Sequence, residues 1–404
     1  MAIPNVSNLA SYPTARFGAI GQSLAAFLYY SHAGYGFKSK FAEIMRGTGN
    51  PADAAIVDGG IEIAPYATGG SFASQNNKDA AEAYDSEAYT SSAVHWIDNS
   101  ATYGSVATSA RSRMLARDAS NKVVHLLADQ GQADAVIAAG LGAFVSPSVG
   151  PVEGADNWEN AWTNLIPGYR EYLESSVTGQ IAWAMIGRSL SLTDTFAYER
   201  IRQKQLQLLA ANPGAIFKGL ETWDLELGDS VHPSSVGQTI YGQRLAEMIA
   251  RELYGVVEYE DTAEQADPGF GTTVKIFEGP TIASVSLAAD NVTVTVTLAS
   301  ETVTGTEDAI YMPPRAGPVP CGFAFWDASE NMDAVFDSSS PPPVQRPSGD
   351  WSWNSATKAL TFTLATPITG TIAMAFPYDN VSDFNPDAVI KGTTSDKPLQ
   401  SWAR

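Results

Sequence analysis

The pattern of apolar and polar residues divides the chain into two unlike parts. Up to residue 257, short continuous apolar runs alternate with segments whose apolar residues recur at helical spacing. This alternation predicts a mostly parallel sheet with helices on both faces. The runs predict buried strands at residues 16–20, 122–128, 180–187 and 215–223, and the periodic segments predict helices at 107–120, 158–176, 198–211 and 236–254.

Residues 258–404 have a different pattern. Valine and leucine alternate strictly with threonine over 292–298, and residues 359–376 repeat this style. Pro-, Gly- and Ser-rich stretches such as 337–350 separate these runs, and no long helical pattern intervenes. The pattern predicts an antiparallel β-sandwich. We therefore expect two domains, 1–257 and 258–404, as the length of 404 residues also favours.

One segment of the first part matches neither pattern. Residues 34–60 contain several glycines and predict loops rather than a regular element.

Composition and charge narrow the classes of function. With 44 acidic and 24 basic residues, the net charge of −20 argues against nucleic acid or an anionic membrane as the partner. Cys321 is the only cysteine, so no internal disulfide framework is expected and the residue is interpreted as a small buried hydrophobe. The sequence leaves the oligomeric state open.

Neither a leader nor a membrane span is expected. Residues 1–17 have no basic start followed by a long apolar core, which predicts no signal peptide. The longest apolar run, 135–145, is shorter than the roughly 17 residues that span a bilayer. We expect a soluble protein that, if it acts outside a cell, leaves by lysis or by assembly into a particle.

The histidines are the first candidates for chemistry. His32, His95 and His125 have no second histidine at metal-ligand spacing, so we expect no metal site, and His125 lies inside a predicted strand. His232 is different, because Asp229 precedes it by three residues and Pro233 follows it. A carboxylate at this spacing could orient the imidazole for proton transfer, or the segment could simply form the turn before the last helix.

A serine stands at the other end of the same part. Gly21-Gln22-Ser23 follows the first predicted strand, where a strand-to-helix turn can present a side chain at the sheet edge. Gly and Ser are also ordinary turn residues. The chain order Ser23, Asp229, His232 fits a Ser-His-Asp triad, but Ala25 excludes the Gly-x-Ser-x-Gly elbow of α/β-hydrolases.

Four short blocks together resemble a known family. They are Gly21-Gln22-Ser23, Gly69-Gly70-Ser71, Gln130-Gly131-Gln132-Ala133-Asp134 and Asp229-x-x-His232-Pro233. In this order they resemble the SGNH (GDSL-like) hydrolases, and most nearly the sialate O-acetylesterase-like carbohydrate esterases. Arg202 and Gln205 are similar to a further Arg-x-x-Gln pattern of that group, and the C-terminal segment is similar to a tail that returns to the catalytic domain.

The resemblance implies a flavodoxin-like fold and a role for each matching residue. Ser23 would be the nucleophile, His232 the general base, and Asp229 the residue that orients it. The oxyanion would be held by the backbone N–H groups of Ser23 and Gly70 and by the side-chain amide of Gln130. It implies an esterase that removes acetyl groups from a carbohydrate without a cofactor.

Substrate contacts are expected from three further residues. Gln22 and Gln132 flank the proposed nucleophile and oxyanion residues, although Gln132 stands where the family has Glu. Trp158, in a stretch that reads as a turn, could stack on a sugar ring, whereas Trp162 is better explained by helix packing. The alternating aromatics of 322–326 and 351–353 could form a sugar-binding stripe, but the core of a sandwich gives the same spacing.

A second interpretation assigns the chain to a different class of protein. A carbohydrate- or receptor-binding surface protein of a phage or phage-like particle could use an esterase scaffold, and it would bind sugar without turnover.

Overall fold

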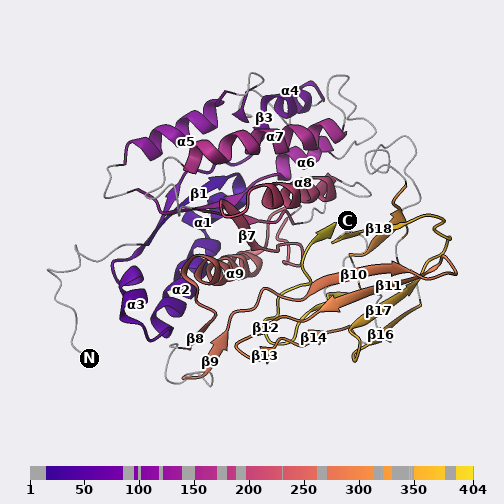
Figure 1. Ribbon diagram of the computed structural model, residues 1–404. Helices are drawn as coiled ribbons and strands as arrows, with labels where there is room; N and C mark the ends of the chain where they lie inside the picture. Colours follow the sequence, from indigo (N-terminus) through magenta and orange to yellow (C-terminus); the bar gives the residue numbers. More distant parts are fainter. Residues whose placement is uncertain are drawn as a thin grey trace.

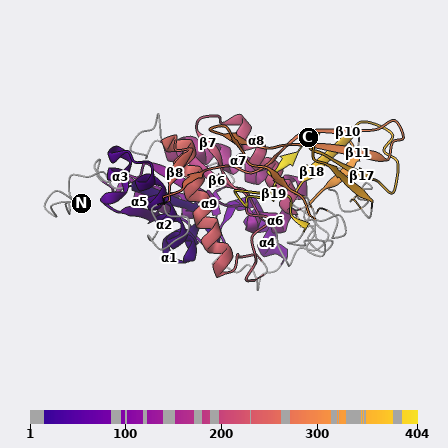
Figure 2. The ribbon, with the colours of Figure 1, turned by 90° about the horizontal axis from the view of Figure 1, so that it is seen from below.

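A computed structural model describes residues 15–84, 95–98, 102–117, 122–138, 151–170, 180–187, 197–229, 231–261, 271–313, 320, 322–329, 345, 347, 350–377 and 388–403. Figure 1 shows a layered α/β part and, beside it, a part built of strands. The view from below in Figure 2 places these two parts side by side along the length of the molecule. Cys321 lies outside the described residues.

A five-stranded parallel sheet forms the centre of the α/β part. Its order is β2-β1-β5-β6-β7, which is 2-1-3-4-5 when its strands are numbered along the chain. This is the flavodoxin-like order of a doubly wound sheet. The strands are β1 (Ala15–Gly21), β2 (Ile61–Pro65), β5 (His125–Asp129), β6 (Ile181–Ala184) and β7 (Ile216–Leu220).

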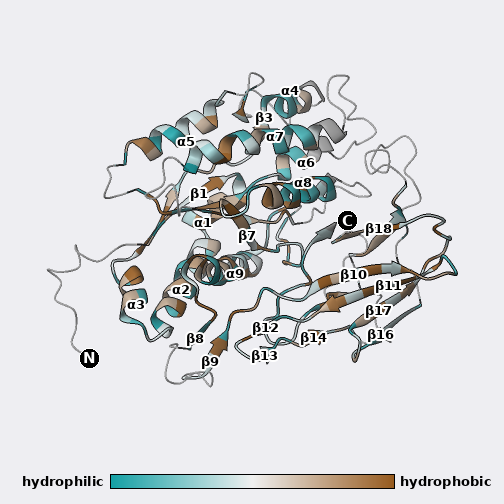
Figure 3. Cartoon of the chain, viewed as in Figure 1, coloured by the Kyte–Doolittle hydropathy of each residue, from teal (hydrophilic) through white to brown (hydrophobic). Residues whose placement is uncertain are grey.

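Helices cover both faces of this sheet, as predicted. Alternate strand residues enter two separate apolar cores: Ile20 and Leu126 pack with helices α5, α7 and α8, whereas Phe17 and Leu127 pack with α2 and α9. In Figure 3 these helices carry both hydrophilic and hydrophobic residues, as a helix between a sheet and solvent requires. The helices are α1 (Ser23–Tyr30), α2 (His32–Gly47), α3 (Pro51–Asp58), α4 (Gln75–Tyr84), α5 (Ser105–Leu115), α6 (Gln132–Ala138), α7 (Pro151–Arg170), α8 (Ala197–Ala211) and α9 (Ser235–Tyr254).

The prediction of loops over residues 34–60 is wrong, because α2 and α3 occupy most of this segment. One of the glycines that suggested loops, Gly36, lies where α2 meets α9. A Cβ on Gly36 would come within 2.5 Å of the Thr239 carbonyl oxygen, and one on Gly242 within 2.0 Å of the Ala33 carbonyl oxygen. Glycine therefore permits the close approach of these two helices.

Two antiparallel sheets and several short ribbons make up the strand-rich part. Strands of both sheets contribute to one apolar core, including Val294, Phe325, Phe362 and Phe376, as expected for a sandwich. The alternating aromatic residues Phe323 and Phe325 are buried in this core. Their burial favours the interpretation that the aromatic residues of 322–326 are core residues rather than a sugar-binding stripe. One sheet is β10 (Thr281–Leu287), β11 (Thr293–Ala299), β17 (Ala359–Thr363) and β16 (Trp351–Asn354), and the other is β15 (Ala324–Asp327), β18 (Ile372–Phe376) and β20 (Trp402–Ala403).

The remaining strands form two-stranded ribbons. In the α/β part β3 (Phe72–Ser74) pairs with β4 (His95–Ile97), and just after residue 257 β8 (Glu258–Glu260) pairs with β9 (Thr273–Lys275). In the second part they are β12 (Thr302–Val303) with β13 (Thr306–Glu307), and β14 (Ile310–Tyr311) with β19 (Lys391–Gly392). Tyr259 and Ile276, at and just after the β8–β9 ribbon, pack into the α/β core.

The last residues of the chain contact the α/β part directly. The Ser401 hydroxyl donates to Glu221 Oε2 at 2.6 Å, and the Trp223 indole N–H donates to the Leu399 carbonyl at 3.3 Å. Arg244 donates to the Asp396 carbonyl at 3.0 Å. These bonds join the C-terminal segment to the elements around β7.

Candidate active site

Ser23 stands at the carboxyl end of β1, as the first residue of α1. The turn before it needs glycine, because Gly21 has a φ of +116° and a Cβ there would lie 1.9 Å from the Asp129 carbonyl oxygen. The Gln22 backbone N–H donates to that same oxygen at 2.9 Å. Ser23 is thereby fixed between the ends of β1 and β5, where the strand order of the sheet reverses and where ligands of such folds bind.

His232 joins Ser23 to Asp229. Its Nε2 atom lies 2.8 Å from Ser23 Oγ, and its Nδ1 atom lies 2.8 Å from Asp229 Oδ2. Ser23 comes from the first strand of the sheet, whereas Asp229 and His232 come from the loop after the last one. The fold thus brings Ser23 next to two residues that follow it by about two hundred positions in the chain. The imidazole lies between the hydroxyl and the carboxylate.

The loop that carries Asp229 and His232 is held by its own hydrogen bonds. Asp229 Oδ1 accepts from the backbone N–H groups of Val231 at 2.8 Å and His232 at 2.7 Å. Burial alone would raise the pKa of the Asp229 carboxyl, but these donors and the His232 ring lower it overall. Asp229 is therefore an ionised acceptor that orients the imidazole. The loop ends where the Ser234 hydroxyl caps α9 by accepting from Gly237 N–H at 3.2 Å.

The Gly69–Ser71 turn lies against the end of β1. Thr68 N–H donates to the Gly21 carbonyl at 3.0 Å, and the Ser71 hydroxyl donates to the Thr68 carbonyl at 2.7 Å. Gly70 has a φ of +66°, which favours glycine. Within the described residues, the backbone N–H groups of Ser23 and Gly70 have no hydrogen-bond acceptor. Both remain available to an oxyanion.

The expectation that Gln130 donates directly to an oxyanion is not supported. Its side chain is fully buried, and its amide group donates to the Ser71 carbonyl at 3.2 Å and to Asp134 Oδ2 at 2.7 Å. Its oxygen accepts from the indole N–H groups of Trp158 and Trp162. Gln130 is thus held beneath the Gly69–Ser71 turn and fixes the position of that turn.

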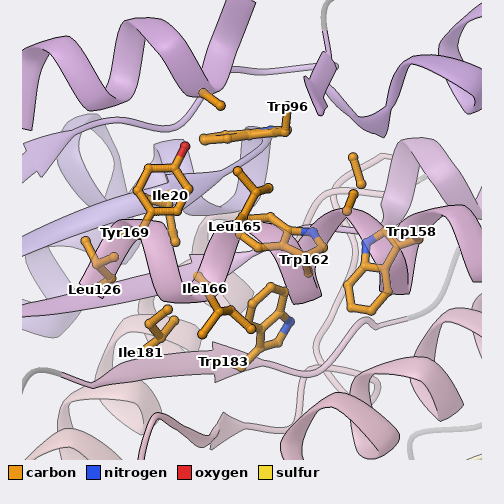
Figure 4. Close-up of a cluster of buried hydrophobic side chains, with 14 of the residues drawn as sticks. Ile20, Trp96, Leu126, Trp158, Trp162, Leu165, Ile166, Tyr169, Ile181 and Trp183 are labelled. Atoms are coloured by element: carbon orange, nitrogen blue, oxygen red, sulfur yellow. The ribbon is translucent and has the colours of Figure 1, made fainter. Parts of the chain in front are cut away.

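The three residues expected to contact substrate are also buried. Trp158 is part of α7, not of a turn, and it is 0% exposed beside Trp162 and Trp183 (Figure 4). It therefore packs in the core and offers no face to a sugar. Gln22 is buried, and its Oε1 atom accepts from Gly131 N–H at 3.3 Å, which ties the end of β1 to the turn after β5.

Gln132 is buried as well, but it lines a small cavity beside the triad. The cavity has a volume of about 250 Å³, open solvent included, and Leu24, Val231 and Pro233 also line it. These three residues neighbour Ser23 and His232 in the sequence. Gln132 donates to Asp129 Oδ1 at 2.7 Å, and its Oε1 atom has no hydrogen-bond partner among the described residues.

Two buried carboxyl groups lie beneath the site. Asp134, within the third sequence block, accepts from Ala73 N–H, Asn77 and Gln130, and burial raises its pKa to about 6. Asp129 accepts from Gln132 and from the Tyr241 hydroxyl at 3.0 Å, and burial raises its pKa to about 7. Sequence reasoning missed Asp129, the last residue of β5, although its place directly before Gln130 was a signal.

The other histidines stand apart from the triad. His125 is buried in β5, its Nδ1 atom accepts from Gln180 N–H at 3.3 Å, and burial lowers its pKa to about 4. It is a neutral core histidine, as the sequence indicated. His32 is exposed and His95 is half-buried. No group of three or more His, Cys, Asp or Glu side chains in the described part of the chain is arranged to hold a metal ion.

In the residues that the structure describes, no helix combines the length and the apolar character needed to cross a bilayer.

Comparisons with known proteins give only distant similarities. No protein-family profile matches the chain, and no curated protein matches its sequence. A solved protein from Arabidopsis thaliana is 16% identical with a TM-score of 0.32, covering 48% of this chain and 61% of that one. A candidate arylesterase from Agrobacterium tumefaciens is 10% identical with a TM-score of 0.35, covering 60% and 99% respectively. A gut microbial diltiazem-metabolizing enzyme is 12% identical with a TM-score of 0.32, covering 71% and 56%.

Proposed function

We propose that this chain is a serine esterase that removes short acyl groups, above all acetyl, from a carbohydrate. The observation that carries the proposal is the continuous chain of hydrogen-bond contacts from Ser23 Oγ through the His232 ring to Asp229, with 2.8 Å at each step. A hydroxyl, an imidazole and an ionised carboxylate in this arrangement form an activated nucleophile.

The first half of the reaction follows from this geometry. Ser23 Oγ attacks the ester carbonyl carbon while its proton passes to His232 Nε2. Asp229 stabilises the imidazolium that forms and keeps the Nδ1 proton in place. The carbonyl oxygen becomes an oxyanion, which the backbone N–H groups of Ser23 and Gly70 bind. Removing one such donor from an enzyme typically lowers the rate by about a hundredfold or more.

The second half returns the enzyme to its starting state. The bond between the carbonyl carbon and the alcohol oxygen breaks, and His232 Nε2 protonates the departing hydroxyl. Water then attacks the acyl-serine and gives its proton to His232, and the carboxylic acid leaves as Ser23 regains its proton. Besides the substrate and the attacking water, these steps use only groups of this chain.

One observation supports the short acyl group of the proposed substrate, and another supports its carbohydrate. Leu24, Val231 and Pro233 line a small pocket and neighbour Ser23 and His232 in the sequence, which favours a short acyl group over a long one. The carbohydrate is favoured by the four sequence blocks that resemble the carbohydrate esterases, two of which supply the triad while the other two lie against the end of β1.

Ester hydrolysis provides the test. Wild type and Ser23→Ala should be compared on p-nitrophenyl acetate, butyrate and octanoate. We expect wild type to cleave the acetate fastest and Ser23→Ala to lose the activity. If both proteins are inert while the wild type binds acetylated polysaccharide, the binding-protein reading replaces the esterase. If octanoate is cleaved fastest, the short-acyl assignment is wrong.

A further inference from the structure

Helix α1 carries aromatic side chains that the reaction itself does not use. Ser23, Phe27 and Tyr30 are spaced at i, i+4 and i+7, which places them on one face of the helix. The aromatic positions therefore continue the line that starts at Ser23. Tyr29 lies next to this line.

These rings are in contact with one another and with the triad. The Phe27 and His232 ring centroids are 5.4 Å apart, with an angle of 62° between the planes. The Phe27 and Tyr30 centroids are 5.7 Å apart and nearly perpendicular, and those of Tyr29 and Tyr30 are 5.2 Å apart. We call Phe27, Tyr29 and Tyr30 the aromatic ridge.

The far end of the aromatic ridge is open to solvent. Tyr30 is 61% exposed, and Tyr35, in the first turn of α2, is 77% exposed. Val236, at the start of α9 just beyond the His232 loop, is 62% exposed. Large apolar side chains left exposed beside a reactive centre are typical of a binding surface.

The aromatic ridge has a fixed place relative to the two sides of the ester. His232 is the group that protonates the departing alcohol, and Phe27 is the ridge residue that contacts its ring. The Tyr29 hydroxyl donates to the Ala67 carbonyl at 3.3 Å, which anchors the ridge to the segment before the Gly69–Ser71 turn. The ridge therefore begins on the alcohol side of the reaction, as a preformed surface.

We propose that the aromatic ridge binds the sugar ring that carries the ester. This inference rests on the proposed function and assigns the alcohol-side subsite. A pyranose presents a flat face of C–H groups that packs on an aromatic ring, and its hydroxyl groups meet the polar edge at Tyr30, Ser31 and His32. A surface for an acyl chain or a lipid would expose mainly aliphatic side chains, whereas the large apolar side chains that α1 and α2 expose are those of Tyr30 and Tyr35.

The experiment compares two acetate esters that differ in their alcohol. One is a fully O-acetylated methyl xylopyranoside, which offers an ester at every hydroxyl, and the other is ethyl acetate. Released acetic acid gives kcat/KM for wild type, Tyr30→Ala and the control Tyr311→Ala. Tyr311 is an exposed tyrosine of β14 whose ring contacts the Lys391 ammonium rather than any residue of the ridge.

We expect Tyr30→Ala to lower the ratio of sugar-ester to ethyl acetate kcat/KM by about fivefold, the effect of one lost ring contact. The loss should appear in KM, and Ser23→Ala protein should bind the sugar ester more weakly when Tyr30 is also replaced. Tyr311→Ala should leave both substrates unchanged.

Several results would overturn the assignment. The subsite is wrong if Tyr30→Ala leaves the ratio of sugar-ester to ethyl acetate kcat/KM unchanged. It is also wrong if wild type cleaves ethyl acetate but neither binds nor cleaves the sugar ester. In both cases the proposed esterase activity stands. Wild type inert on both esters removes the proposed function and the subsite with it. A change of oligomeric state in Tyr30→Ala, measured by sedimentation, would show that a second copy of the chain covers the ridge.

Discussion

Asp129 offers the sharpest quantitative test of the buried structure beneath the site. Its carboxyl is 1% exposed and accepts one hydrogen bond from Gln132 at 2.7 Å and one from Tyr241 at 3.0 Å. Burial raises its pKa from the ordinary 3.8 to about 7, although both donors lower it. The folded protein therefore binds a proton here that the unfolded chain releases.

Because proton binding is linked to folding, the raised pKa of Asp129 decides how its carboxyl affects stability as the pH changes. A carboxyl whose pKa is raised by folding contributes stability below its unfolded pKa, and this contribution is lost as the pH rises through the folded pKa of about 7. Because each tenfold change in the ionisation equilibrium is worth about 1.4 kcal/mol, ionising this buried group costs about 4 kcal/mol in total.

Asp129→Asn removes that cost and keeps the shape of the side chain. The new amide would face Gln132, whose Oε1 atom has no partner in the described structure and can turn to accept from it. We expect the free energy of unfolding of the variant, relative to wild type, to rise by about 4 kcal/mol between about pH 4 and about pH 8. Urea unfolding followed by tryptophan fluorescence at both pH values measures this difference.

Asp134→Asn is the matched control. Asp134 Oδ1 accepts from Asn77 at 2.8 Å and Oδ2 from Gln130 at 2.7 Å, and Ala73 N–H donates to both oxygens. An amide group at either position would face a donor, so this variant should be about 2 kcal/mol or more less stable than wild type at about pH 4. Because burial raises the pKa of Asp134 to about 6, this deficit should shrink by about 2 kcal/mol by about pH 8, which is less than the change expected for Asp129→Asn. If the difference between Asp129→Asn and wild type does not change with pH, the reasoning about Asp129 is refuted.

Two further predictions concern the triad loop and the helix contact. Asp229→Asn still accepts from the Val231 and His232 N–H groups but cannot stabilise an imidazolium, so kcat on p-nitrophenyl acetate should fall by about a hundredfold or more with an unchanged circular dichroism spectrum. Activity close to wild type would remove Asp229 from the mechanism. Gly242→Ala forces α9 away from the Ala33 carbonyl and should cost about 2 kcal/mol in urea unfolding, whereas Val236→Ala, exposed on the same helix, should cost little. Equal stability of the two variants would contradict the close helix contact.

The sequence predicted the layers of the fold and the three residues that meet at the site. The alternation of apolar runs and helical segments is a local signal, and it placed Ser23 after the first strand and His232 before the last helix. The topology of a doubly wound sheet then brings both to one edge.

What the sequence could not predict depends on contacts between distant elements. Gly36 suggested a loop in the sequence, because only the partner helix reveals that this glycine allows a close approach. Gln130 was expected to hold the oxyanion and Trp158 to stack on a sugar, but their hydrogen bond to each other lies in the core.

The central claim is that His232 makes Ser23 a nucleophile. A phosphonofluoridate tests it directly, because Ser23 Oγ would form a bond to phosphorus, fluoride would leave, and His232 would take the hydroxyl proton. Intact-protein and peptide mass spectrometry should find a single adduct on Ser23 in wild type and none in His232→Ala. An unlabelled wild type, or an adduct on another residue, would contradict the account.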